Sequence, residues 1–125
     1  MRLLEGTILN RAPIVSAVID KAGNLNLVTN GDYGFVVDTG FTGDLAVPYN
    51  LIPKLNLKFI GYEEFGLATR RVIELPVYYG WVKVKSRRYK VKIIPGDELL
   101  GMNFLEKAAS KLIVDFKKDA VKLFG

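Results

Sequence analysis

The chain of 125 residues contains no cysteine and no histidine. Without cysteine it can form neither disulfides nor thiolate metal sites. Without histidine it cannot use Ser-His-Asp or Cys-His catalysis, and it lacks the usual zinc ligands. Carboxylates, lysines and hydroxyls therefore remain as candidate catalytic groups, and the sequence implies no metal or organic cofactor.

The sequence also lacks a long hydrophobic run. No stretch of about eighteen apolar residues occurs, and the amino terminus does not read as a signal peptide, so we expect no membrane segment in this chain. We expect a cytoplasmic protein, or a soluble domain excised from a membrane-anchored parent. Half of the residues are hydrophobic, which is enough for one modest core, and no linker is visible. Residues 1–125 are therefore predicted to form a single domain.

Short alternating or apolar segments, separated by turn residues, make up most of the chain. Asn30-Gly31 indicates a hairpin turn between two of them. Only residues 103–110 favour a helix, with Asn103 as the N-cap and Glu106 completing a capping box. A last hairpin is expected around residues 117–119. The pattern predicts a mainly β, barrel-like domain with one short helix near the carboxyl terminus.

The most informative motif is a hydrophobic segment, residues 35–37, that runs directly into Asp38-Thr39-Gly40. A carboxylate brought toward the interior by an apolar strand is costly unless its surroundings satisfy it, which suggests a purpose. Thr39 can supply a hydroxyl, and Gly40 lets backbone N–H groups approach the carboxylate. The alternative is a purely structural Asx turn that ends the strand.

A second motif, Leu-Leu-Gly-Met-Asn-Phe-Leu at residues 99–105, follows about sixty residues later. Together with Asp-Thr-Gly-Phe-Thr-Gly-Asp-Leu at residues 38–45, it resembles the single-domain, retropepsin-like aspartic proteases, and the resemblance covers nearly the whole chain. It implies the closed β-barrel of the acid protease fold with Asp38 as the catalytic residue. It also implies that Leu100 and Gly101 pack beneath the catalytic loop. Phe41, where many members carry Ser or Ala, is expected to support the same loop.

Hydrolysis of a peptide bond by carboxylates needs two of them sharing one water, one ionised and one neutral. The chain contains Asp-Thr-Gly only once. The economical solution is a C2 homodimer in which each subunit contributes Asp38. The resemblance makes Thr39 the hydroxyl that bonds across the dimer axis, and Gly40 permits close backbone approach.

Residues 62–77 stand where the family carries its flap, a hairpin that covers an extended peptide and hydrogen-bonds to it. The bend of this hairpin is predicted at residues 68–70. Ala68, Thr69 and Leu45 are the expected substrate contacts. An exposed hairpin with a structural role alone is the alternative.

Six of the eighteen basic residues fall between Lys83 and Lys92. Their alternation with apolar residues predicts a half-buried hairpin whose edge is protected by lysine. Tyr89 is the only aromatic residue inside the cluster, so no nucleic acid is expected, although an anionic partner stays open. The sequence thus predicts an aspartic endopeptidase. The alternatives are a proteolytically silent dimerisation domain of the same fold, or a basic module that binds nucleic acid or another anion.

Overall fold

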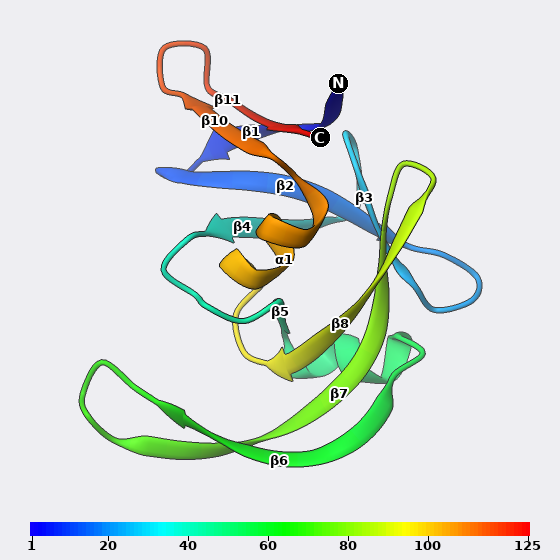
Figure 1. Ribbon diagram of the computed structural model, residues 1–125, viewed down its shortest axis with the longest axis vertical. Helices are drawn as coiled ribbons and strands as arrows, with labels where there is room; N and C mark the ends of the chain where they lie inside the picture. The colour runs from blue at the N-terminus through cyan, green and yellow to red at the C-terminus, as the bar shows by residue number, and fades with distance from the viewer.

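The computed structural model describes residues 1–125, and the chain is mainly β with two short helices (Figure 1). The elements in chain order are β1 (Arg2–Leu9), β2 (Ala12–Ile19), β3 (Leu25–Val28), β4 (Tyr33–Asp38), β5 (Leu45–Val47), the 3₁₀ helix η1 (Tyr49–Lys54), β6 (Lys58–Gly66), β7 (Val72–Val84), β8 (Arg87–Pro95), β9 (Leu99–Gly101), α1 (Met102–Ala108), β10 (Lys111–Asp115) and β11 (Ala120–Phe124). The sequence favours one regular helix, at residues 103–110, and indicates that residues 51–57 are irregular or briefly helical; η1 forms at residues 49–54. Neither helix is long and apolar enough to cross a bilayer.

Seven strands close into a barrel, because the pairings run from β2 through β3, β7, β8, β5, β9 and β4 and return to β2. Alternate side chains of these strands point inward and fill the barrel. The largest fully buried side chains include Phe35, Phe104, Leu25, Leu45, Leu51, Ile93 and Leu100. The prediction of a mainly β barrel is confirmed.

The predicted hairpin at Asn30-Gly31 is wrong. β3 and β4 do not pair with each other, and both pair with β2, where Ala17 faces Leu27 on one side and Tyr33 on the other. Gly31 passes so close to β2 that a Cβ on it would collide with the carbonyl oxygen of Ala17. Gly31 therefore allows the chain to cross close over β2. From the sequence alone, Asn-Gly at such a crossing looks the same as Asn-Gly in a hairpin turn.

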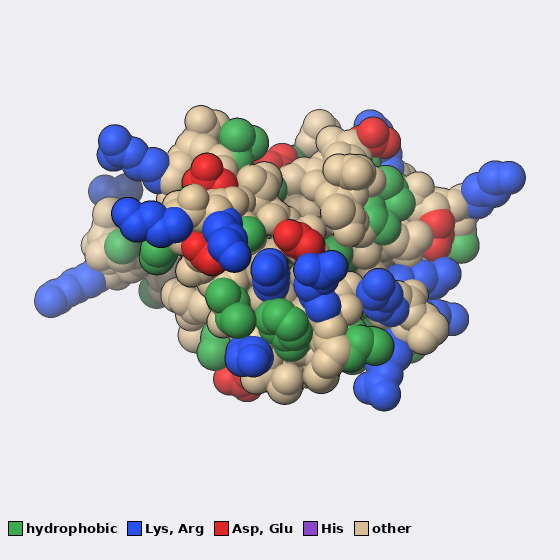
Figure 2. Space-filling view, turned by 90° about the horizontal axis from the view of Figure 1, so that it is seen from above, with side chains coloured by type: hydrophobic (Ala, Val, Ile, Leu, Met, Phe, Trp, Pro, Cys, Tyr) green, Lys and Arg blue, Asp and Glu red, His purple; other side chains and the backbone are tan.

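The two chain ends pair with each other in a ribbon outside the barrel. β11 lies between β1 and β10, and β1 continues the sheet through β2. Val121 and Leu123 of β11 are buried in the core. The surface on this side shows hydrophobic side chains between Lys and Arg side chains (Figure 2). The two chain ends thus hold each other in place within one chain. Deleting residues 121–125 would remove β11, the middle strand of this ribbon, so we expect the deletion to disrupt folding before it affects any dimer.

The hairpin of β6 and β7 extends away from the barrel (Figure 1). Its turn is closed by hydrogen bonds from Leu67 N to Arg71 O at 2.8 Å and from Arg70 N to Leu67 O at 2.9 Å. Arg70 has a φ of 65°. The bend therefore falls at residues 68–70, as predicted. β6 pairs only with β7, so its outer edge has no partner strand.

Asp20 organises the turn that leads into β3. Its Oδ1 accepts hydrogen bonds from Ala22 N and Asn24 N, both at 3.0 Å, and its Oδ2 forms an ion pair with Lys83 Nζ at 3.2 Å. The backbone N–H of Asn24, and after it Lys83, favour the ionised carboxylate. They lower the pKa of Asp20 from 3.8 to about 2.

This lowered pKa predicts a pH dependence of stability. The carboxylate of Asp20 stabilises the fold fully above its unfolded pKa of 3.8, and this contribution is lost as the pH falls through about 2. We expect the Tm of the wild type to fall more steeply over that window than the Tm of Asp20→Asn. Thermal melts followed by circular dichroism measure both. Parallel curves would show that the Asp20 carboxylate has no part in acid sensitivity.

Candidate active site

Asp38 is the last residue of β4 and pairs in parallel register with Gly101 of β9. Its side chain is half-buried, next to the buried Val37. Gly40 N donates to Asp38 Oδ1 at 2.9 Å, and Phe41 N donates to the main-chain oxygen of Asp38 at 3.2 Å. An Asx turn is thus formed, and it leaves Asp38 Oδ2 without a hydrogen-bond partner in the chain.

The loop that follows Asp38 rests on β9 and the start of α1. Met102 N donates to Phe41 O at 2.7 Å, and Leu100 is fully buried in the core. A Cβ on Gly101 would collide with the carbonyl oxygen of Gly43 and would lie 2.8 Å from the Phe41 ring. Gly101 therefore packs directly against Gly43 and the Phe41 ring of the loop, and Leu100 anchors β9 in the core.

Substituting Gly101→Ala should destabilise the protein by about 1–3 kcal/mol, because its Cβ meets backbone and aromatic atoms that have little room to move. Urea unfolding measures the change in the free energy of unfolding. Gly66→Ala is the matched control, since an added Cβ at this exposed position meets nothing within 4 Å. If both substitutions shift the midpoint alike, close packing against Gly43 is not what Gly101 provides.

A second carboxylate in the loop, Asp44, escaped the sequence analysis and is buried, with only 4% of its surface exposed. Its Oδ2 accepts a hydrogen bond from Lys92 N at 2.9 Å, and its Oδ1 accepts one from Asn103 Nδ2 at 2.7 Å. Lys107 Nζ lies 3.2 Å from both oxygens. Asp44 thereby fastens the loop to β8 and α1. The sequence did contain a signal for its burial, because Asp44 is followed by the apolar residues 45–47 just as Asp38 is preceded by the apolar residues 35–37.

The predicted capping box at Asn103 is wrong. α1 begins one residue earlier, at Met102, and its N-cap residue is Gly101, which has no side chain to cap the helix. The amide of Asn103 donates to Asp44 instead. A tertiary contact with a buried carboxylate has replaced the local cap that the sequence favours.

A cleft of about 490 Å³ lies between the Asp38 loop and the β6–β7 hairpin. Residues 40–45 form one wall and residues 63–66 of β6 form the other, with Leu45 in the first wall. Of the three expected substrate contacts, only Leu45 lies in the lining of this cleft, and it is fully buried in the wall, with 0% of its surface exposed. Ala68 and Thr69 are exposed at the hairpin tip and do not line it.

Asp38 and Thr39 lie beside the cleft and are not part of its lining. Thr39 is exposed, and its hydroxyl makes no hydrogen bond in the single chain. It borders a smaller groove of about 140 Å³ whose lining includes Met102, Leu112 and Leu123, next to α1 and the terminal ribbon. The loop thus faces the larger cleft on one side and an apolar groove on the other.

An ion pair joins the hairpin to the barrel wall. Lys92 Nζ of β8 lies 3.1 Å from Glu63 Oε1 of β6, and both side chains are about half exposed. The hydrogen bond to the Glu63 carboxylate raises the pKa of Lys92. An exposed pair of this kind contributes only about 0–1 kcal/mol. The pair therefore adds little to the stability of the hairpin's position.

No protein-family model matches this chain, and comparisons with curated proteins and with solved structures gave no significant match. The function of this chain must therefore be inferred from its own structure. Three features bear on it: the Asp38 loop, the contacts of Gly101 and Asp44 that support this loop, and the cleft under the β6–β7 hairpin.

Proposed function

We propose that this chain is an aspartic endopeptidase that works as a homodimer, with Asp38 of each subunit at one shared site. Asp38 and Thr39 belong to an Asp-Thr-Gly motif at the end of a core strand. The proposal extends the resemblance to retropepsin-like proteases that the sequence motifs carry, and the closed barrel agrees with it.

The observation that carries the proposal is the contrast between the two carboxylates of the loop. Both oxygens of Asp44 are occupied by donors, and the residue is buried. Asp38 is half-buried and has one oriented oxygen and one free oxygen. A carboxylate held in one orientation, with an oxygen left for water, is what an acid–base catalyst requires.

A lone carboxylate is not sufficient, because one group must accept a proton from water while another protonates the leaving nitrogen. Asp44 cannot be the second group, since Lys92, Asn103 and Lys107 already bind it. In a dimer, repulsion between the two Asp38 carboxylates would keep one of them protonated. Water held between them would attack the peptide carbonyl, and the protonated carboxyl would supply the proton that releases the amine.

The substrate would be a polypeptide in extended conformation. The outer edge of β6 has no partner strand, and residues 63–66 of that strand line the cleft. An extended peptide in the cleft could hydrogen-bond to this edge as an added strand. The cleft volume of about 490 Å³ suits several side chains of such a peptide.

The subunit interface would lie at the Asp38 loop and the apolar groove beside it. Thr39 has an unused hydroxyl there, and Met102 exposes 38% of its surface at the same groove. Hydrogen bonds between the two Thr39 hydroxyls would hold both loops in register. The terminal ribbon borders this groove through Leu112 and Leu123, although its strands pair within one chain.

Dependence on concentration tests the shared site. We expect cleavage of an unfolded protein substrate per mole of chain to rise with chain concentration and to level off as dimers form. Sedimentation over the same concentrations gives the dimer fraction, and the two curves should coincide. Full activity of a sedimenting monomer would refute the shared site, and a dimer without peptidase activity would favour a proteolytically silent module.

A further inference from the structure

The outer face of the β7–β8 hairpin carries aromatic side chains from β7 beside basic side chains from β8. Tyr79 and Trp81 of β7 lie opposite Lys92 and Lys90 of β8, so these four side chains share one face of the sheet. The guanidinium of Arg88 lies 4.3 Å from the Trp81 ring centroid, and Lys90 Nζ lies 4.4 Å from the Tyr79 ring centroid. We call Tyr79, Trp81, Arg88 and Lys90 the aromatic-basic face.

The sequence could not show this arrangement. The basic cluster of β8 contains one aromatic residue, Tyr89, and it turns inward and packs edge-on against Phe104 with ring centroids 5.9 Å apart. The aromatic rings of the outer face come from β7 instead, through the strand register. The reason for expecting no nucleic acid therefore does not hold for the folded chain.

The charges of this face differ in how far they are neutralised. Lys83 is paired with Asp20, and Lys92 is paired with Glu63. Arg88 and Lys90 form no ion pair, and both are exposed. With a net charge of +5 on the whole chain, the two free cations give this face an attraction for polyanions.

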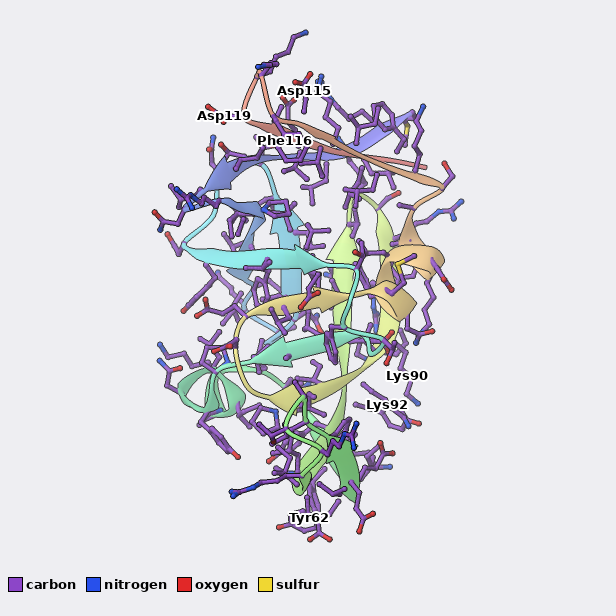
Figure 3. The ribbon with its side chains drawn as sticks, turned by 90° about the vertical axis from the view of Figure 1, so that its left-hand side faces the viewer. Tyr62, Lys90, Lys92, Asp115, Phe116 and Asp119 are labelled. Atoms are coloured by element: carbon purple, nitrogen blue, oxygen red, sulfur yellow. The ribbon has the colours of Figure 1, made fainter.

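A groove runs alongside the rings. It has a volume of about 380 Å³, and its lining includes Leu57, Lys58 and Ile60 together with Tyr79, Trp81 and Lys90. Lys90 and Lys92 also border a second groove of about 240 Å³ that continues toward Lys107. Figure 3 shows Lys90 and Lys92 projecting from the same side of the molecule.

We propose that the aromatic-basic face binds single-stranded nucleic acid. Unpaired bases would stack on Trp81, on Tyr79 and on the guanidinium plane of Arg88, while Lys90 and Arg88 contact phosphates. Stacking needs bases that are not already paired, so duplexes should bind less well. The binding would be tolerant of sequence, because every base has a flat face that can stack. This property is independent of Asp38 and of peptidase activity.

Trp81 is the only tryptophan of the chain, so its fluorescence reports directly on this face. Titrating the full chain with oligo(dT) or oligo(U) of about 15 nucleotides should quench the emission of Trp81. The affinity should fall as salt rises. Inorganic polyphosphate, which has no bases, should compete weakly, and vesicles rich in anionic lipid should not displace the oligonucleotide. Equal competition by polyphosphate, or preference for the vesicles, would overturn the proposal.

Variants separate stacking from charge, with binding followed by the anisotropy of a labelled oligonucleotide. Trp81→Leu should weaken binding about tenfold without changing the salt dependence. The double variant Arg88→Gln, Lys90→Gln should also weaken binding. It should reduce the slope of log affinity against log salt concentration by about one to two, as expected for the loss of one to two phosphate contacts. The matched control is Lys117→Gln, Lys118→Gln, in the β10–β11 turn where Figure 3 places Phe116, far from Lys90. Circular dichroism confirms that each variant is folded.

The control variant also loses two positive charges and with them some general attraction for a polyanion, and its affinity should nevertheless stay within about twofold of wild type. If it weakens binding as much as the Arg88, Lys90 variant does, the attraction comes from net charge and the face is not a site. If Trp81→Leu is folded and binds as tightly as wild type, stacking on this face is refuted.

Discussion

Asp38→Asn should abolish peptide hydrolysis while leaving the fold intact. The amide has the shape of the carboxylate, and its oxygen can still accept the hydrogen bond from Gly40 N that Asp38 Oδ1 accepts at 2.9 Å. It cannot take up or release a proton, so both steps of the chemistry fail. We expect a loss of at least about 10²–10⁴-fold in kcat/KM. Cleavage of an unfolded protein, followed from acid to neutral pH, measures this loss.

The matched control is Asp32→Asn, the same change at an exposed aspartate that makes no hydrogen bond. It should retain full activity. Circular dichroism and sedimentation should show wild-type secondary structure and assembly for both variants. Appreciable hydrolysis by folded Asp38→Asn would remove Asp38 from the catalytic role.

Asp44→Ala should give the largest loss of stability, about 2–4 kcal/mol, because it strips partners from several groups at once. Lys92 N and the Asn103 amide lose their acceptor in a part-buried setting, and Lys107 loses its ion pair. A cavity also opens where the carboxylate lay. Urea unfolding gives the change in the free energy of unfolding.

Asp32→Ala serves as the control for this stability loss, and an exposed position of this kind should shift the free energy of unfolding by no more than about 0.5 kcal/mol. We also expect Asp44→Ala to lower activity at temperatures where the variant remains folded, since Asp44 holds the wall of the cleft. A variant as stable as wild type would mean that water replaces the carboxylate and that the loop needs no anchor.

Features that depend on neighbouring residues could be predicted from the sequence. The strand that ends at Asp38 and the β6–β7 bend follow from apolar runs and their interruptions. The last hairpin also forms as predicted, with Asp119 in a positive-φ conformation at its turn. Leu45, which the sequence analysis names as an expected substrate contact, lies in the lining of the cleft.

Features that depend on distant residues could not be predicted. Asn103 prefers the Asp44 carboxylate to a helix cap, and Gly31 serves a crossing over β2 instead of a turn. The outer position of Trp81 beside Lys90 follows from the register of β7 on β8, which no local pattern fixes. The tip residues Ala68 and Thr69 fall outside the cleft because the hairpin is longer than the cleft wall.

The most direct test of the central claim, that two chains share one catalytic site, is a subunit-mixing experiment. Wild-type chain at a fixed amount is unfolded, mixed with increasing amounts of Asp38→Asn chain, and refolded before the peptidase assay. Because mixed dimers hold only one Asp38 carboxylate, we expect activity to fall progressively as the inactive chain sequesters wild-type chains. Asp32→Asn chain, added in the same way, should increase activity. Activity that stays constant while Asp38→Asn chain is added would show that each chain acts alone, and would contradict the shared site.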